Sequence, residues 1–502
     1  MSTNVLNAVP IKYIIPNIDF MKKHIESFLP YIVVFLASLY RPYDADLGWH
    51  LKYGEFFFKN LSILTDNTFS TMMPDFKWAN ISWGIDLVYY SVFSSFGFLG
   101  LTLLGALIIT LTFFFFSKAF DLSYWEQSLI FPLLLIIEEP INQVSFRGQL
   151  LSLLIFGILI FLLKKYEDKP KYIFLTVPLF FIWANLHGQF ILGLGVFFIW
   201  AIIQIFNKYL DNPKNLTAVR ESAKTLSLAF FLSSAVILIH PFGAAVYMDA
   251  FLHFENADLK SVLEYLPFDE RSTQWWYLLI VGILAAVGVV FMYFEDKLKS
   301  NIPYLGLFGI LYTLTFFVKR YAWSMYYLSI PFLKPVASFF KPNGKRNTFI
   351  VATVLFIFYL QLAIYFKSPF TQYTNMSWDV YCKEYAHCSP ASVEYLIKEK
   401  LDKNLLTLYN WGGYMIWNYP QIKPSIDGRM HLWRDKKGYS AFSDYYGYEQ
   451  NLKDIDDSSY DVVLMSPEKP VYKRLLKLVR DGKWKLVYKD KYSGVFVRKD
   501  LF

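Results

Sequence analysis

Long apolar runs dominate most of the chain and set its class. A helix needs roughly 20 apolar residues to cross a bilayer core, and about eleven segments approach that length. They lie at residues 26–42, 98–117, 126–140, 148–164, 172–187, 189–207, 224–240, 274–294, 303–318, 321–340 and 347–366. The pattern predicts a multi-span α-helical membrane domain over residues 1–366. Residues 81–96 mix polar and apolar positions and predict an interfacial or re-entrant helix.

The last part of the chain, residues 367–502, has ordinary polarity and a shorter rhythm. Its periodicity changes between helical and alternating patterns, which predicts a small soluble α/β domain. The expected helices lie at 391–401 and 469–482, and the expected strands at 404–410, 460–466, 484–490 and 493–499, of which the last two form a hairpin.

Basic residues predict the orientation of the spans, because cytoplasmic loops carry an excess of Lys and Arg. Four short gaps are rich in these residues: 164–171, 207–224, 295–301 and 341–346. Placing these gaps in the cytoplasm puts the N-terminus there as well. The first outer loop, residues 43–80, and the tail then lie outside a plasma or inner membrane. No small-residue cleavage site follows the first apolar run, so we expect that run to be retained.

Composition agrees with a membrane protein and argues against nucleic-acid binding. The 502 residues are 55% hydrophobic and 18% charged, compared with roughly 25% charged residues in soluble domains. The net charge is +8, and the basic residues of the apolar part cluster in the short gaps between its runs. No soluble segment carries a basic cluster with interleaved aromatic residues, so we expect no nucleic-acid partner.

The stretch "RPYDADLGWH", residues 41–50, places two carboxylates where the chain leaves the first span. A helix that starts near Asp46 would place Asp46 and His50 on one side, beside an apolar stripe suited to the membrane interface. A single Asp is enough to cap such a helix. A pair of Asp residues favours a functional role, in which one carboxylate accepts a proton and the other binds a hydroxyl or a cation. We therefore predict that Asp44 and Asp46 are catalytic, with metal binding as an alternative role, and that His50 contacts substrate unless it is a simple interfacial histidine.

Other polar candidates lie in segments threaded to the same outer face. Arg147, Lys319 and Arg320 suit a phosphate group; the alternative is that each is an interfacial anchor. His187 lies in "NLHGQ" and Glu264 in a long outer loop. We predict substrate contact for both; the alternatives are a turn histidine and a solvated loop carboxylate.

The tail contains two stretches rich in glycine and aromatic residues, "YNWGGYMIW" and "PSIDGRMHLW". Trp411, Asp427 and Arg429 within them could stack on a sugar and bond to its hydroxyls. The alternative is a strand pair packed on the membrane domain.

Cys382 and Cys388 are the only cysteines, and five residues separate them. On an oxidising outer face they are placed for a small-loop disulfide. Metal binding is the weaker alternative, because His387 beside them leaves no convincing fourth ligand.

Several motifs together resemble the GT-C superfamily of polyprenyl-phosphate-dependent glycosyltransferases. In that superfamily the first outer loop carries an acidic D-x-D-like motif, and the C-terminal end is often a soluble outer domain. The chain is more closely similar to a group of uncharacterised bacterial GT-C-like membrane proteins with a "DxDxWWH" element. The matching stretches are "DADLGWH" (44–50), "ISWGIDL" (81–87), "RGQ" (147–149), "NLHGQF" (185–190), "HPFG" (240–243), "EYLP" (264–267), "WGGYMIW" (411–417) and "IDGRMHLW" (426–433). The departures are Gly48 for the first Trp, Asp86 for Glu and Phe242 for Tyr.

This resemblance implies transfer of a sugar from a polyprenyl phosphate or diphosphate to a glycan, lipid or protein at the outer face. Asp44 would act as general base or metal ligand, Asp46 would assist, and Asp86 would contact substrate. A divalent metal such as Mg or Mn is a possible cofactor. The alternatives are a transporter or flippase for a lipid-linked saccharide and a non-catalytic envelope assembly protein. The scarcity of Asp, Lys and Arg inside the apolar runs and the lack of a visible inverted repeat favour the transferase.

Overall fold

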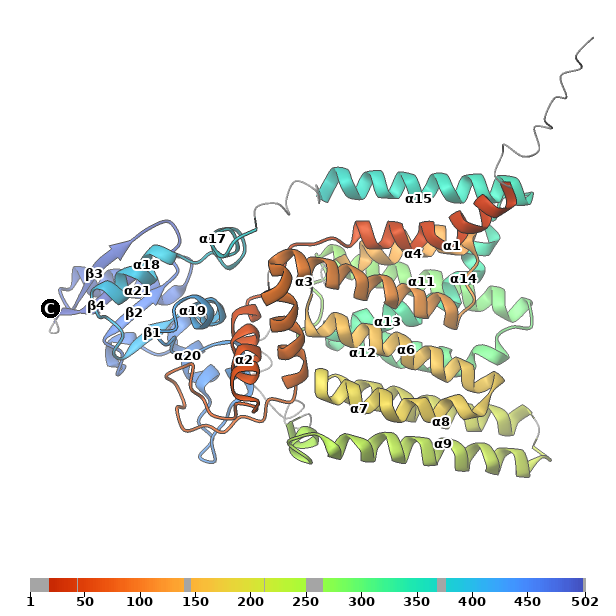
Figure 1. Ribbon diagram of the computed structural model, residues 1–502, viewed down its shortest axis with the longest axis horizontal. Helices are drawn as coiled ribbons and strands as arrows, with labels where there is room; N and C mark the ends of the chain where they lie inside the picture. Colours follow the sequence, from red (N-terminus) through yellow and green to blue (C-terminus); the bar gives the residue numbers. More distant parts are fainter. Residues whose placement is uncertain are drawn as a thin grey trace, which may run out of the picture.

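The computed structural model describes residues 18–42, 44–139, 146–211, 213–249, 265–367 and 376–499. It consists of a bundle of long helices and a tail containing a small sheet, with helix α2 (Leu47–Asn60) standing between them (Figure 1). The bundle and the tail are the two parts that the sequence predicts, while the exact boundary at residue 367 stays a prediction.

Within the described residues, seven helices are long and apolar enough to cross a membrane. They are α3 (Trp83–Ala119), α6 (Gly148–Asp168), α8 (Phe190–Asp211), α9 (Leu216–Val236, prolonged by η3, Ile237–Ile239), α11 (Thr273–Phe294), α12 (Ile302–Phe317, preceded by η6, Lys299–Asn301) and α15 (Lys345–Lys367). The chain is therefore a helical membrane protein.

Eleven spans are not confirmed, because four expected segments form shorter, interrupted or more polar helices. These are α1 (Ile18–Ala37), α4 (Tyr124–Ile137), α7 (Thr176–Leu186, preceded by η2, Pro170–Leu175) and the pair α13 (Ala322–Leu328) and α14 (Ile330–Phe339). Each packs within the bundle. For α1, the first turns contain Lys22, Lys23 and Glu26, which lower its apolar character.

Helix α3 contains both the expected interfacial segment and an expected span. At Gly97 the backbone takes φ 59° and ψ −151°, which breaks the helix; glycine reaches this conformation without the steric cost that other residues meet. Residues before Gly97 stand beside α2 at the end of the bundle, and residues after it enter the bundle (Figure 1).

The two ends of the bundle differ in the residues that they carry. Successive helices reverse direction, so the connections α6–α7, α8–α9, α11–α12 and α14–α15 gather at the end away from the tail (Figure 1). These connections contain the four basic gaps. The acidic loop before α2 lies at the opposite end, next to the tail. The assignment of these ends to cytoplasm and exterior stays a prediction based on charge.

The tail contains a four-stranded sheet in the order β1-β2-β4-β3. Strand β1 (Leu405–Thr407) runs parallel to β2 (Val462–Met465), whereas β3 (Trp484–Lys489) and β4 (Gly494–Arg498) form the predicted antiparallel hairpin. The expected helices are present as α18 (Pro390–Lys398) and α21 (Pro470–Arg480). The other helices in the described part of the tail are α17 (Trp378–Tyr381), η8 (Cys382–Ala386), η9 (Tyr409–Trp411), α19 (Gly412–Asn418), η10 (Gly428–Leu432), α20 (Ala441–Glu449) and η11 (Ile455–Asp457).

Two expectations for the tail are decided by this arrangement. The stretch 411–417 is helical, so the alternative of a strand pair there is wrong. Cys382 and Cys388 are joined by a disulfide, with their Cα atoms 5.0 Å apart, as the sequence predicted.

Candidate active site

The loop between α1 and α2 presents both predicted catalytic carboxylates. Asp44 is buried and Asp46 is half-buried. The Asp46 main-chain N–H donates to Asp44 Oδ1 at 3.2 Å, and Arg147 Nε lies 3.5 Å from Asp44 Oδ2. Asp46 occupies the N-cap position of α2, but its side chain accepts no capping hydrogen bond. Helix capping therefore does not account for the two carboxylates.

Helix α2 holds this loop between the bundle and the tail. It packs against α3 on one side and α19 on the other. A Cβ atom at Gly48 would come within 1.8 Å of the Gly413 carbonyl oxygen, and one at Gly54 within 2.3 Å of the Asp86 carbonyl oxygen. The departure at Gly48 thus has a structural reason, since a Trp has no room there. Protein covers Leu47, Leu51 and Gly54 on the apolar side of α2, whereas Phe58 is 50% exposed, and a position at the membrane interface stays a prediction.

His50 is held by a carboxylate from α3. Its Nδ1 lies 2.5 Å from Asp86 Oδ1, and Asn80 Nδ2 donates to Asp86 Oδ2 at 2.5 Å. The imidazole ring stacks on Trp49 at 3.6 Å and on Tyr89 at 4.7 Å between centroids. A histidine oriented by a carboxylate at one nitrogen keeps the other nitrogen for a ligand or a proton. The sequence predicts Asp46 and His50 on one side of the helix, but the hydrogen bond of His50 goes to Asp86 on α3.

The electrostatics distinguish the two loop carboxylates. Burial and then the charge of Asp44 raise the pKa of Asp46 to about 6, although His50 and Arg147 act in the opposite direction. Among the described residues Asp46 forms no ion pair, whereas Asp44 faces Arg147. A carboxyl group with a pKa near the working pH is suited to accept and release protons. Asp46 therefore fits the role of proton acceptor better than Asp44 does. The sequence assigns this role to Asp44.

Arg147 and His187 lie at the same end of the bundle, around the start of α6. Arg147 is the residue directly before that helix. The His187 ring covers the next residue, since a Cβ at Gly148 would lie 2.9 Å from His187 Cδ2. His187 Nδ1 is 2.8 Å from the hydroxyl of Ser152, one turn further along α6. The structure thus places Arg147 beside the acidic loop and His187 against Gly148, the residue that follows Arg147.

The other predicted phosphate contacts lie on the connection between α12 and α13. Lys319 and Arg320 belong to η7 (Lys319–Tyr321). The Arg320 guanidinium lies 4.9 Å from the Tyr265 ring centroid and donates to the Tyr265 hydroxyl. No ion pair links either residue to the acidic loop within the part of the chain that the structure describes. Glu264 lies outside the described residues.

The three predicted sugar contacts in the tail are buried. Trp411 donates its Nε1–H to the Ala386 carbonyl oxygen at 3.0 Å and is 1% exposed. The side chains of Asp427 and Arg429 have no exposed surface and form an ion pair at 2.6 Å. Burial pushes the pKa of Asp427 upward, but the charge and hydrogen bonds of Arg429 hold it below its ordinary value. These contacts are structural, so we leave all three residues out of the proposed substrate site.

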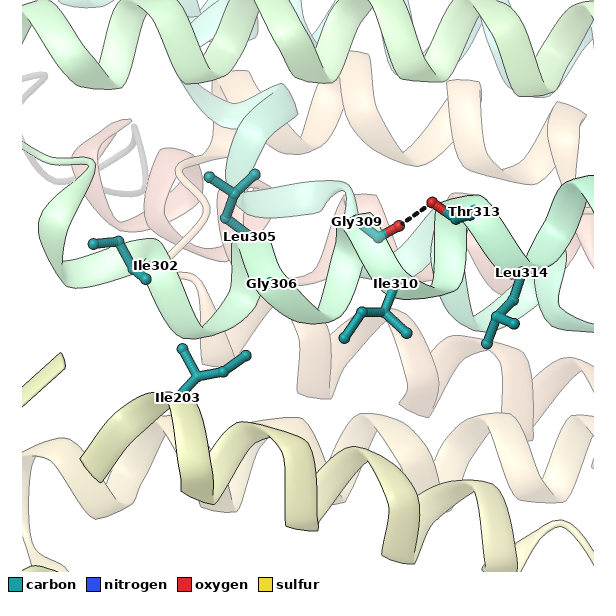
Figure 2. Close-up of a pocket in the computed structure, with 8 residues that line it drawn as sticks. All are labelled: Ile203, Ile302, Leu305, Gly306, Gly309, Ile310, Thr313 and Leu314. Atoms are coloured by element: carbon teal, nitrogen blue, oxygen red, sulfur yellow. Dashed lines mark hydrogen bonds between the residues drawn. The ribbon is translucent and has the colours of Figure 1, made fainter. Parts of the chain in front are cut away.

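An apolar groove of about 640 Å³ lies between α8 and α12 (Figure 2), and none of the predicted site residues lines it. The hydroxyl of Thr313, its one polar side chain, donates to the Gly309 carbonyl oxygen at 2.9 Å. The groove is lined by Ile203, Ile302, Leu305, Gly306, Gly309, Ile310, Thr313 and Leu314. It contains no titratable side chain and carries no chemistry, although its surface suits a lipid chain.

The residues around the acidic loop give little support to a metal site. Among the described residues, no group of three or more His, Cys, Asp or Glu side chains is placed to hold an ion. Asp44 and Asp46 offer two carboxylates, and Arg147 already faces one of them. A divalent metal at the acidic loop stays a prediction.

Three residues of the site were not singled out from the sequence. Asn80 and Tyr89 orient Asp86 and His50, and Tyr381 from the tail bonds to the Asp44 main chain. No local sequence motif identifies these three residues. Tyr89 and Tyr381 contact residues that are far away in the sequence, and Asn80 precedes the helix that carries its partner, Asp86.

Comparison with known proteins adds no further assignment. No protein-family model matches the chain, and no curated protein matches it either.

Proposed function

We propose that the protein transfers a sugar from a polyprenyl phosphate or diphosphate to an acceptor at the tail-facing end of the bundle. The observation that carries this proposal is the convergence of Asp44, Asp46, Arg147 and the His50–Asp86 pair at that end. A donor of this class has an apolar chain within the bilayer and a charged head at its surface. A polar site at the end of a bundle of apolar helices matches that division.

Asp46 is the proposed general base. It takes a proton from the acceptor hydroxyl or amide as the acceptor atom bonds to the anomeric carbon of the sugar. The bond from that carbon to the phosphate oxygen breaks, and the electron pair leaves with the phosphate. A carboxylate whose pKa is about 6 is ionised at neutral pH and still basic enough to accept the proton.

Arg147 is the proposed partner of the departing phosphate. A guanidinium forms paired hydrogen bonds with phosphate oxygens and keeps its charge at all relevant pH values. In the structure it faces Asp44 at 3.5 Å, a distance longer than that of a tight ion pair. Asp44 then serves to orient Arg147 beside Asp46, and His50 is placed to bind a sugar hydroxyl.

Membranes that contain the protein, incubated with radiolabelled polyprenyl-linked sugars, test this proposal. We expect one labelled donor to be consumed and its sugar to appear in an acceptor. Asp46→Asn should lower the transfer about 100-fold or more, whereas Asp75→Asn, at an exposed position later in the first outer loop, should leave it intact. Movement of unchanged donor across a sealed vesicle would instead identify a transporter. Equal transfer by the wild type and Asp46→Asn would contradict the assigned base.

A further inference from the structure

The tail touches the acidic loop directly, and two of these contacts lie at Asp44 and Asp46 themselves. The hydroxyl of Tyr381 donates to the Asp44 carbonyl oxygen at 2.5 Å. Gly428 lies against the Asp46 carboxylate, where an added Cβ would come within 1.7 Å of Oδ1. The tail therefore forms one wall of the candidate active site, and the membrane bundle alone does not complete it.

A buried cluster next to Gly428 fastens the tail to the first outer loop. We call it the Arg429 clamp, and it consists of Arg429, Asp427, Tyr53, Asn67 and Ser70. The guanidinium donates to both Asp427 oxygens at 2.7 and 2.6 Å and to the Tyr53 hydroxyl at 2.6 Å. It also donates to Asn67 Oδ1 at 3.3 Å and Ser70 Oγ at 3.1 Å. Of these partners, Tyr53 belongs to α2, and Asn67 and Ser70 belong to the segment between α2 and α3. Asp427 is the one partner from the tail.

Main-chain bonds and aromatic rings extend this contact. The N–H groups of Thr71 and Met72 donate to the carbonyl oxygens of Pro424 and Ser425, each at 3.0 Å. Four rings surround the guanidinium, with centroids 5.2 to 5.8 Å from its carbon. They belong to Tyr53, Phe69, Trp78 and Trp433. A buried charge that is fully hydrogen-bonded holds a single arrangement, because any other leaves polar groups unpaired.

We propose that the tail positions the acidic loop for catalysis and that Tyr381 is a positioning residue. This inference rests on the proposed transferase function. Tyr381 is 1% exposed and lies between Trp378 and Tyr414, so it acts through Asp44 and does not touch substrate. Its hydroxyl fixes the main chain of Asp44, which precedes the proposed base by two residues. The Arg429 clamp keeps the hydroxyl in reach.

Tyr381→Phe tests the inference, because it removes one hydroxyl and keeps the ring. We expect kcat per folded molecule to fall about tenfold, the effect of losing one hydrogen bond, with the KM for the lipid donor unchanged. The matched control is Tyr472→Phe, another buried tail tyrosine, which packs on Phe496 and whose hydroxyl has no hydrogen-bond partner among the described residues. It should retain wild-type kcat. Unchanged kcat in Tyr381→Phe would overturn the inference.

A second readout separates this inference from the proposed function. Both native cysteines are in the disulfide, so Ala45→Cys would supply the single free thiol of the chain. Combining it with Tyr381→Phe should raise the rate of maleimide labelling about tenfold, whereas Tyr472→Phe should leave that rate unchanged. If the wild type transfers no sugar, the proposed function fails, yet the labelling rates still test whether Tyr381 holds the loop. Equal labelling rates of Ala45→Cys alone, with Tyr381→Phe and with Tyr472→Phe would refute that role.

Discussion

Arg429→Met removes the only charge that faces Asp427 inside the clamp and should loosen the tail from the acidic loop. Methionine retains much of the apolar stem but none of the five donors. Asp427 would keep the hydrogen bond from Ser70 and the one from the Arg429 main chain, at 3.1 Å. Its ionised carboxylate would otherwise remain in a site with no exposed side-chain surface.

The magnitude follows from that burial. Removing one partner of a buried ion pair costs about 3–5 kcal/mol, because the other charge is left uncompensated. We expect Arg429→Met to lower the free energy of unfolding of the tail–loop interface by this amount. Adding Asp427→Asn removes the stranded charge and should recover at least 2 kcal/mol of the loss. The matched control is Lys453→Met. Its ion pair with Asp444 has a similar length of 2.6 Å, but the Lys453 side chain is 52% exposed, so about 0–1 kcal/mol is expected.

Urea unfolding of the detergent-solubilised protein, followed by tryptophan fluorescence, measures these differences. Trp78 and Trp433 lie within 5.8 Å of the guanidinium carbon and report on this interface. The slope of the transition should match that of the wild type, so that the midpoint gives the change in stability. A loss below 1 kcal/mol in Arg429→Met, or no recovery in the double variant, would refute the account of the clamp.

Three further predictions concern the same end of the molecule. Gly48→Ala should destabilise the α2–tail contact by about 1–3 kcal/mol in thermal unfolding, because its methyl group meets a tail carbonyl; Gly195→Ala, at an open helical position, should be tolerated. Cys382 and Cys388 should react with a thiol reagent only after reduction, as judged by mass shift; labelling of the unreduced protein would contradict the disulfide. The folded pKa of Asp427 is lowered, so its contribution to stability is complete above about pH 4 and is lost as the pH falls further. Fluorescence against pH should show the interface opening there, and an interface equally stable well below pH 4 would contradict this.

The sequence predicted the two-part architecture because periodicity is a local property. The tail helices and the β3–β4 hairpin follow from runs of a few residues each. The number of spans cannot be predicted in the same way. Helices α4 and α14 are short, yet they lie in apolar runs about as long as those of the spans. Apolar length shows that a helix is buried in lipid or protein, without distinguishing the two.

The site was predicted in part, because its contacts join distant segments. The D-x-D spacing pointed to the acidic loop, but His50 pairs with Asp86, 36 residues away, and Asp44 with Tyr381, 337 residues away. Aromatic residues beside Asp427 and Arg429 matched the composition of a sugar site. A buried guanidinium surrounded by aromatic rings has the same composition as a sugar-binding site. Only the burial of the side chains, which the sequence does not give, distinguishes the structural cluster from the binding site.

The pH dependence of sugar transfer tests the central claim most directly. Asp46 must be ionised to accept a proton, so kcat/KM for the acceptor should rise about tenfold per pH unit below its pKa of about 6 and level off above it. The residual activity of Asp46→Asn should lack this acidic limb, whereas Asp75→Asn should retain it. A wild-type rate that is constant from pH 5 to pH 8, or an acidic limb that persists in Asp46→Asn, would contradict the proposed role of Asp46.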